Sequence, residues 1–343
     1  MTERERVLAA VDHKEPDICP CYVSKIDDKE YFYKAYGVSS DAEMRDYLGC
    51  DLRKSEYNPH FRRTPGVTIW GSVDNWDAGY STARGGYPLS GIDDVKGIDE
   101  YPWPTADIID YAAIRRECEI IDGRFSRILS VGSLLAMTTL MDMFGMEEAL
   151  VGLHLDEPVV VAAISHIEKF CLESIEQTLK AGADLCDFMW VGDDFATQRG
   201  MMISPQVWRR HLKPMYAKVF ALIKSYGCRV WFHSCGTFRP VMGDLIDIGM
   251  DVWETVQAHL VGNEPEQLKA EFGKDITFFG AIGSQNTLPF GTPDDVRREV
   301  RERFRVLGKG GGYIIGVDHS IQKNMSAENI FALFDEVKNC SYG

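Results

Sequence analysis

The stretch SPQVWRRHLKPMYAKVFALIKSYGCRVWFHSCG, residues 204–236, contains one complete helix–strand unit. Ser204 and Pro205 are typical of the start of a helix, and Gly227 is typical of its end. The apolar run RVWFHS, residues 229–234, then predicts a strand that ends in polar side chains. Repetition of this unit along the chain would indicate an α/β fold with a parallel sheet.

The unit does recur. Helical patterns separate five further apolar runs: RILSVGS (127–133), DLCDFMWVGD (184–193), DVWETV (251–256), ITFFGAIG (276–283) and YIIGVDH (313–319). Six strands, with one or two more before residue 70, approach the eight strands of a (β/α)₈ TIM barrel. A doubly wound open sheet is disfavoured because no GxGxxG motif follows an early strand. We therefore predict a single barrel domain over residues 1–343.

The first 110 residues differ from the rest and predict a loop and helix elaboration at the N-terminus. Residues 1–12 have the apolar spacing of an amphipathic helix, and KEPDICPCYV, residues 14–23, predicts an extended segment. Residues 30–110 look irregular, whereas residues 111–343 form regular βα repeats. Four aromatic residues in the irregular part either pack together or line a pocket for a flat ligand: Trp70, Trp76, Tyr80 and Tyr87.

The composition limits the class of partner. A formal net charge of −15 argues against nucleic acid, which requires a basic surface. No apolar run approaches the roughly 18 residues of a membrane span. The charged start MTERERVLAAVDHKEPD has no secretory pattern, so we expect a cytoplasmic protein whose nine cysteines are mostly reduced thiols.

Polar side chains follow five successive predicted strands. Because the carboxyl ends of barrel strands meet on one face, these side chains predict one polar site there. We assign substrate binding to most of them, together with two of the aromatic residues: Asp194, Gln198, Arg199, Gln257, Gln285, Asp318, Gln322, Trp76 and Tyr80.

His233 and Cys235 form a His-x-Cys pair at the end of one predicted strand. Alternate side chains of a strand point to the same side, so one metal ion could take both as ligands. A catalytic zinc ion needs three protein ligands and an open fourth position, and His319 is a natural third ligand. Glu254 or Asp318 could be a fourth or displaceable ligand. The alternative is a buried histidine beside a buried cysteine, without a metal.

The adjacent carboxylates Asp193 and Asp194 also have two interpretations. Either can cap a helix N-terminus. Alternatively, one of them is a carboxylate of raised pKa that acts as a general acid or orients a ligand. The side chains of adjacent residues normally diverge, so we expect only one of the two to face the site.

Three stretches resemble the uroporphyrinogen decarboxylase superfamily: RVLAAVDHKEPDICP (6–20), the segment from GDDFATQRG to DVWETVQ (192–257), and GGGYIIGVDHSIQKNMSAENI (310–330). The resemblance spans nearly the whole chain and implies a (β/α)₈ barrel. It also implies one of two activities. Members of the superfamily include metal-free decarboxylases of the haem pathway and zinc-dependent methyltransferases that work with corrinoid proteins.

The resemblance is greater to the methyltransferase branch. The decarboxylases carry an arginine-rich motif near the N-terminus, whereas PCYVSKIDDKEYF, residues 20–32, has no arginine and two aspartates. His233-x-Cys235 is similar to the metal-binding pair of the methyltransferases. In the thiol-activating members the third ligand is a cysteine, and here His319 takes its place. One fewer thiolate leaves the metal a stronger Lewis acid, which suits an ether oxygen or an amine nitrogen.

We therefore predict a methyltransferase that moves a methyl group between a small O-methyl or N-methyl substrate and a corrinoid protein. Zn²⁺ would be held by His233, Cys235 and His319, with Asp193 or Glu254 as the catalytic carboxylate. The corrinoid (cobalamin) would be carried by a partner protein, and the enzyme itself could form a homodimer. The transfer could also run onward to a carrier such as tetrahydrofolate. The alternatives are a metal-free decarboxylase and a non-catalytic barrel that docks a corrinoid protein.

Overall fold

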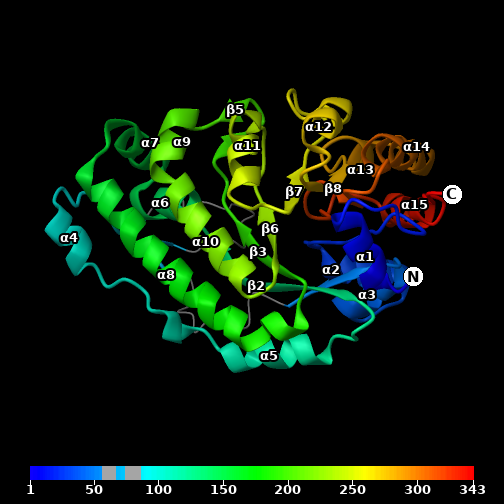
Figure 1. Ribbon diagram of the computed structural model, residues 1–343, viewed down its shortest axis with the longest axis horizontal. Coiled ribbons are helices and arrows are strands. Elements are labelled where there is room, and N and C mark those ends of the chain that lie inside the picture. The colour runs from blue at the N-terminus through cyan, green and yellow to red at the C-terminus, as the bar shows by residue number, and fades with distance from the viewer. Residues whose placement is uncertain (56–66, 74–85) are drawn as a thin grey trace.

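The computed structural model describes residues 1–55, 67–73 and 86–343, with the backbone alone at 131–134. Its centre is a curled sheet of seven parallel strands in the order β1-β2-β3-β6-β7-β8-β9 (Figure 1). The strands are β1 Leu52–Lys54, β2 Ser126–Leu134, β3 Phe188–Gly192, β6 Arg229–His233, β7 Val252–Val256, β8 Thr277–Ile282 and β9 Tyr313–Val317. A separate antiparallel pair, β4 Ala196–Thr197 and β5 Gly200–Met201, follows β3.

The six strands predicted between residues 127 and 319 are confirmed as strands of this sheet, and their parallel pairing confirms the α/β class. The predicted barrel of eight strands is present only in part, because the sheet formed by the described residues has seven strands. The gap between β9 and β1 contains Pro20–Tyr22. The Tyr22 and Ile315 backbones are hydrogen-bonded, and the Cys21 carbonyl accepts from the Asp51 N–H at 2.9 Å.

Helices cover the outside of the sheet (Figure 1). Those of the first half are α1 Glu3–Val11, α2 Lys29–Tyr36, α3 Asp41–Tyr47, α4 Val95–Glu100, α5 Tyr111–Ile120, α6 Ala136–Phe144, α7 Met146–Leu155 and α8 Pro158–Gly182. Those of the second half are α9 Pro205–His211, α10 Lys213–Ser225, α11 Arg239–Asp247, α12 Pro265–Phe272, α13 Thr287–Phe290, α14 Pro293–Arg303 and α15 Ala327–Val337. Short turns of other helical types are η3 Ala106–Ile108, η4 Ala183–Leu185 and η5 Phe304–Gly308.

Two expectations about helices were wrong. The single helix expected at 204–227 is divided into α9 and α10, because Pro214 cannot donate a backbone hydrogen bond and is accommodated in the first turn of a new helix. The irregular segment expected at 30–110 contains α2, α3 and α4. Each of these begins at a capping residue, Asp28, Ser40 or Asp94, whose side chain accepts from the first helical turn.

Apolar side chains fill the interior of the curled sheet. Val7 and Val11 of α1 pack against them, so α1 lies across the amino-terminal ends of the strands. The inner cluster also includes Tyr22, Leu52, Ile128, Phe188, Trp231, Val252, Phe279 and Ile314. The Gly312 N–H donates to the Ala10 carbonyl at 2.7 Å, which fixes α1 beside the start of β9. The interior is therefore closed at this end by packed side chains.

None of the helices in the described ranges is by itself long and apolar enough to cross a membrane. Helices α7 and α8 reach the required length and composition only as a pair, and that pair is bent by 105°.

Candidate metal centre

A second layer of inward-facing side chains lies above the apolar interior, towards the carboxyl ends of the strands. Because strand side chains alternate, the residue two positions beyond each inner apolar residue faces the same side. This rule places Ser24 above Tyr22, Lys54 above Leu52, Trp190 above Phe188, His233 above Trp231 and Glu254 above Val252. The same sheet face that is apolar in its lower half is thus polar in its upper half.

His233, Cys235 and His319 come together at this edge, with ligand atoms that all lie within 4.8 Å of one another. The His233 Nε2 atom lies 3.7 Å from the Cys235 Sγ atom. His319 follows β9, and its ring centroid lies 6.2 Å from that of His233. The sequence prediction that these three side chains meet is confirmed as geometry.

Each of the two imidazole rings is contacted at its Nδ1 atom by a neighbouring polar side chain. The Nδ1 atom of His233 lies 3.4 Å from Oε1 of Glu254. The Nδ1 atom of His319 lies 3.2 Å from the Ser320 hydroxyl, which in turn donates to Asp27 at 2.8 Å. A contact at Nδ1 favours the tautomer whose lone pair is on Nε2, so both rings are prepared to present Nε2 to a shared ion.

Glu254 is buried and accepts several hydrogen bonds. The Ser24 hydroxyl donates to Oε1 at 2.7 Å, while the indole N–H groups of Trp190 and Trp231 donate to Oε2. Burial would raise the pKa of this carboxyl, but the interactions with His233, Lys54 and Ser24 together outweigh burial and lower the pKa to about 2. Glu254 is therefore a fixed negative charge behind His233.

The cluster also favours a thiolate. Burial would raise the pKa of the Cys235 thiol, but hydrogen bonds with His233 and His319 outweigh it and leave that pKa below its usual value. Burial likewise opposes the charged imidazole of His319, and hydrogen bonding with Cys235 still raises its pKa. A thiolate is the form of cysteine that binds metals.

This donor set fits a zinc ion. Zinc binds imidazole nitrogen at about 2.0 Å and thiolate sulfur at about 2.3 Å, so two such atoms on one tetrahedral ion stand roughly 3.5 Å apart. The observed separation of 3.7 Å between His233 and Cys235 agrees with this value. Three protein ligands with a fourth position left open are typical of catalytic zinc sites.

The carboxylates of Asp193 and Asp194 have different partners, as expected of adjacent residues whose side chains diverge. Oδ1 of Asp194 accepts from the Cys235 N–H at 2.8 Å and lies 3.9 Å from Nε2 of His233, so Asp194 borders the cluster. The carboxylate of Asp193 is fully buried and accepts from the N–H groups of Met137 and Thr138 at the start of α6. Asp193 therefore caps a helix that is distant in sequence, which is the structural interpretation of this residue.

Replacement of Asp193 by asparagine is expected to lower the free energy of unfolding by about 2–3 kcal/mol. Burial raises the pKa of this carboxyl to about 6, yet four donors, including the hydroxyls of Thr138 and Tyr216, point at its two oxygens. An amide satisfies them at only one oxygen. Urea denaturation measures the loss, and the exposed Asp275→Asn variant is the control. Loss of metal without loss of stability would contradict this role.

The other predicted binding residues lie around the cluster at different distances from it. Oε1 of Gln257 accepts from the Gly236 N–H at 2.8 Å and holds the turn after Cys235. Gln198 donates to Gln285 at 2.7 Å, which links the β4–β5 turn to the segment after β8. Asp318 is buried, and its Oδ1 accepts from the Ser284 N–H at 3.0 Å. Substrate contact by these residues stays a prediction.

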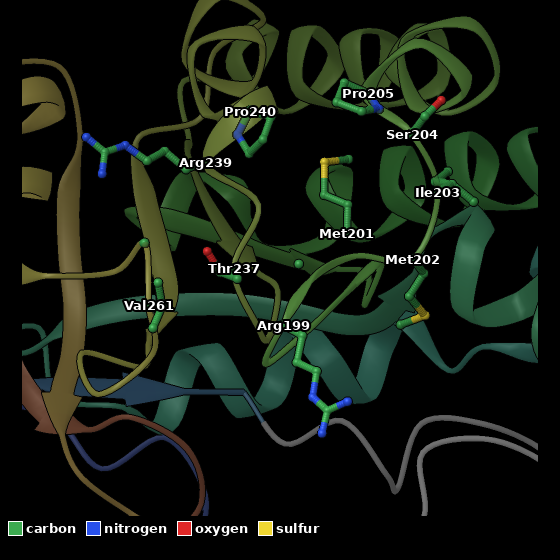
Figure 2. Close-up of a pocket in the computed structure, with 12 residues that line it drawn as sticks. Arg199, Met201, Met202, Ile203, Ser204, Pro205, Thr237, Arg239, Pro240 and Val261 are labelled. Atoms are coloured by element: carbon green, nitrogen blue, oxygen red, sulfur yellow. The ribbon is translucent and has the colours of Figure 1, made fainter.

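Two further predicted residues, Gln322 and Arg199, have other neighbours. Gln322 follows β9, where its backbone N–H contacts the Met325 sulfur at 3.5 Å. Arg199 lines a neighbouring groove of about 550 Å³ between the β4–β5 hairpin and the starts of α9 and α11. Figure 2 shows Met201 extending between Pro205 and Pro240, while Arg199 points away from them.

The predicted aromatic wall is only partly described. Trp76 and Tyr80 lie outside the described residues, so their predicted substrate contacts stay predictions. Trp70 is buried and packs edge to face on Phe170 of α8, with ring centroids 5.0 Å apart. Trp70 therefore packs in the interior, which is the first of the two roles considered for these aromatic residues.

We did not predict from the sequence that the inner layer includes Lys54, Trp190 and Ser24, or that a Ser320–Asp27 pair lies behind His319. For Trp190 and Lys54 a usable signal existed. Both lie two residues beyond an apolar inward position of a strand, as His233 does. The Ser320–Asp27 contact joins residues 293 positions apart, so no local pattern indicates it.

The curled parallel sheet and the His/Cys/His cluster at its carboxyl edge define a barrel-type α/β protein with donors suited to a metal ion. The chain belongs to the uroporphyrinogen decarboxylase (URO-D) family, whose model matches residues 107–340. This match confirms the resemblance identified in the sequence. No curated protein matches the chain significantly.

Two solved structures are similar over nearly their whole length. A methyltransferase from Methanosarcina mazei is 17% identical, with a TM-score of 0.70 over 99% of both chains. A glycoside hydrolase family 5 enzyme, PbGH5A from Prevotella bryantii B14, is 10% identical, with a TM-score of 0.42 over 98% of this chain and 99% of that one. The first supports the fold.

Proposed function

We propose that this protein is a zinc-dependent methyltransferase that moves a methyl group between a small O-methyl or N-methyl substrate and a corrinoid protein. The observation that carries the proposal is the His233, Cys235 and His319 cluster, whose donor types and spacing suit zinc with an open position. A metal-free decarboxylase has no need of such a set. The similar Methanosarcina mazei protein is a methyltransferase, which agrees with the proposal.

The roles of the side chains follow from their contacts. His233, Cys235 and His319 would hold the ion, which when bound would supply a Lewis acid to the heteroatom that carries the methyl group. The Glu254 carboxylate lies 3.4 Å from Nδ1 of His233, and the Ser320 hydroxyl lies 3.2 Å from Nδ1 of His319. In place of Asp193, the proposal gives Asp194 the task of orienting the substrate or holding a proton near the leaving heteroatom.

The proposal includes a complete (β/α)₈ barrel, in which Pro20–Tyr22 takes the position of the eighth strand. Its backbone hydrogen bonds to Ile315 on one side and to Asp51 on the other support this assignment. Ser24 would then be an inward residue of that strand, which agrees with its contact with Glu254. A cytoplasmic location, a corrinoid-carrying partner and a homodimer remain predictions of the same proposal.

The test is methyl transfer to cob(I)alamin from a panel of methoxylated aromatic compounds and methylamines, with purified protein whose zinc content has been measured. We expect about one zinc per chain, and transfer that is lost after chelation and restored by added zinc. Absence of stoichiometric zinc, together with full activity of a His233→Ala variant, would refute the proposal. Release of carbon dioxide from uroporphyrinogen would instead favour the decarboxylase alternative.

A further inference from the structure

The backbone on either side of Cys235 is held by buried or half-buried side chains. Cys235 lies two residues beyond the end of β6, outside the paired part of that strand. Because peptide groups are planar, the two groups that flank a Cα atom set the direction of its side chain. The N–H of Cys235 donates to Oδ1 of Asp194, and the N–H of Gly236 donates to Oε1 of Gln257, both at 2.8 Å. Each flanking peptide group therefore has a fixed partner.

Asn263 adds a further contact to this turn from the segment between β7 and α12. Its side-chain amide donates to the Gly236 carbonyl at 3.1 Å and to the Gln257 carbonyl at 3.3 Å. One amide thus joins the turn after Cys235 to the backbone of the glutamine that accepts from the same turn. Asn263 and Gln257 are both buried, so water does not readily replace these hydrogen bonds.

The conformation of Gly236 makes such contacts necessary. Its φ angle is +85°, and glycine by itself allows many backbone conformations, so the observed turn depends on the groups that contact it. A Cβ atom at this position would lie 2.6 Å from the Thr197 carbonyl oxygen, which also accepts from the Thr237 N–H at 3.1 Å. The β4–β5 hairpin and Asn263 therefore both contact the turn.

We infer that Asn263 is a positioning residue, which directs the Cys235 sulfur towards His233 and His319 by fixing the turn at Gly236. This inference deepens the proposed function and rests on it for the role of Cys235 as a zinc ligand. Zinc sites keep their metal–ligand distances within about 0.2 Å of standard values, so a looser turn would weaken the bond to sulfur. Asn263 itself would touch neither the ion nor the substrate.

The experiment compares two buried asparagines that make the same number of contacts. Like Asn263, Asn329 donates to two backbone carbonyls, those of Leu288 and Gly291, at 2.9 and 2.8 Å. These carbonyls belong to the α13 segment and not to the turn at Gly236. Asn329→Ala and Asn329→Ser should therefore lose as much stability as the same changes at Asn263, and they are the matched controls.

Zinc affinity is measured by competition with a chromophoric chelator, and circular dichroism and urea denaturation establish folding and stability. We expect Asn263→Ala to bind zinc about 10-fold more weakly than the wild type, the lower end for a residue that orients a ligand. Asn263→Ser retains one donor and should lose less. Both Asn329 variants should keep the wild-type affinity. With Co²⁺ in place of Zn²⁺, the thiolate-to-cobalt absorption band should change in Asn263→Ala and stay unchanged in Asn329→Ala.

Wild-type zinc affinity in the folded Asn263 variants would overturn the inference, and so would equal losses at the two asparagines. Failure of both Asn263 variants to fold would overturn it too, because Asn263 would then be required for the fold as a whole. The expected pattern of zinc affinities, in a protein that transfers no methyl group to cob(I)alamin, would retain the positioning role and refute the proposed function.

Discussion

Replacement of Cys235 by serine is expected to leave the protein folded but nearly free of bound zinc. Cys235 is the only thiol within reach of His233 and His319 among the described residues, and a serine hydroxyl does not ionise to replace a thiolate at neutral pH. We expect zinc affinity to fall by more than about 100-fold, beyond the loss caused by changing an outer-shell partner. Methyl transfer should fall with it.

Zinc affinity is measured by competition with a chromophoric chelator. Cys340→Ser is a matched control, because that buried thiol contacts the Glu336 carbonyl and lies outside the cluster. The control should bind zinc as the wild type does. A Cys235→Ser protein that still holds one zinc per chain would show that the three side chains are not the metal site.

Replacement of Glu254 by glutamine is expected to weaken zinc binding by about 100-fold, the upper end for a residue that orients a ligand. An amide of similar shape lacks the charge that faces Nδ1 of His233, and its NH₂ group meets indole N–H donors. Ser24→Ala removes only one donor to Glu254 and should weaken zinc binding by less than about 10-fold. Circular dichroism establishes that both variants are folded.

The same variant separates two roles of Glu254. Weaker zinc binding, with activity restored by excess zinc, would identify Glu254 as a positioning residue. Unchanged zinc affinity with lost transfer would favour the catalytic role predicted from the sequence, in which this carboxylate acts on the substrate.

Much of the second half of the fold could be predicted, because its strands are apolar runs bounded by clear helix caps. The seven-strand sheet was harder to predict at its N-terminal side. β1 has three residues, two of them charged, and a period-two pattern needs a longer run than that. Pro20 has no N–H to donate, so the segment beside β9 makes few backbone hydrogen bonds of the kind that join strands. A proline at this position also makes the segment hard to recognise as a strand from its sequence.

The part of the candidate site whose residues lie at the ends of recognisable strands could be predicted from the sequence. His233 and Cys235 share a strand end, and His319 follows another, so barrel geometry alone brings them together. Asp193 was different, because its partners are backbone N–H groups of α6, more than 50 residues earlier. Which of two adjacent carboxylates faces the cluster depends on that tertiary contact, and the sequence does not contain it in any local form.

The position of α1 across the amino-terminal ends of the strands limits the route by which other molecules can reach the His/Cys/His cluster. With Val7 and Val11 packed into that end, the cluster can be reached only from the carboxyl edge of the sheet, as far as the described residues define it. Under the proposed function, a small methyl donor and a large acceptor protein would then have to use one entrance in turn. While the acceptor is docked it would block that entrance, so each transfer would require the small molecule to arrive first and the protein to leave before the next one enters.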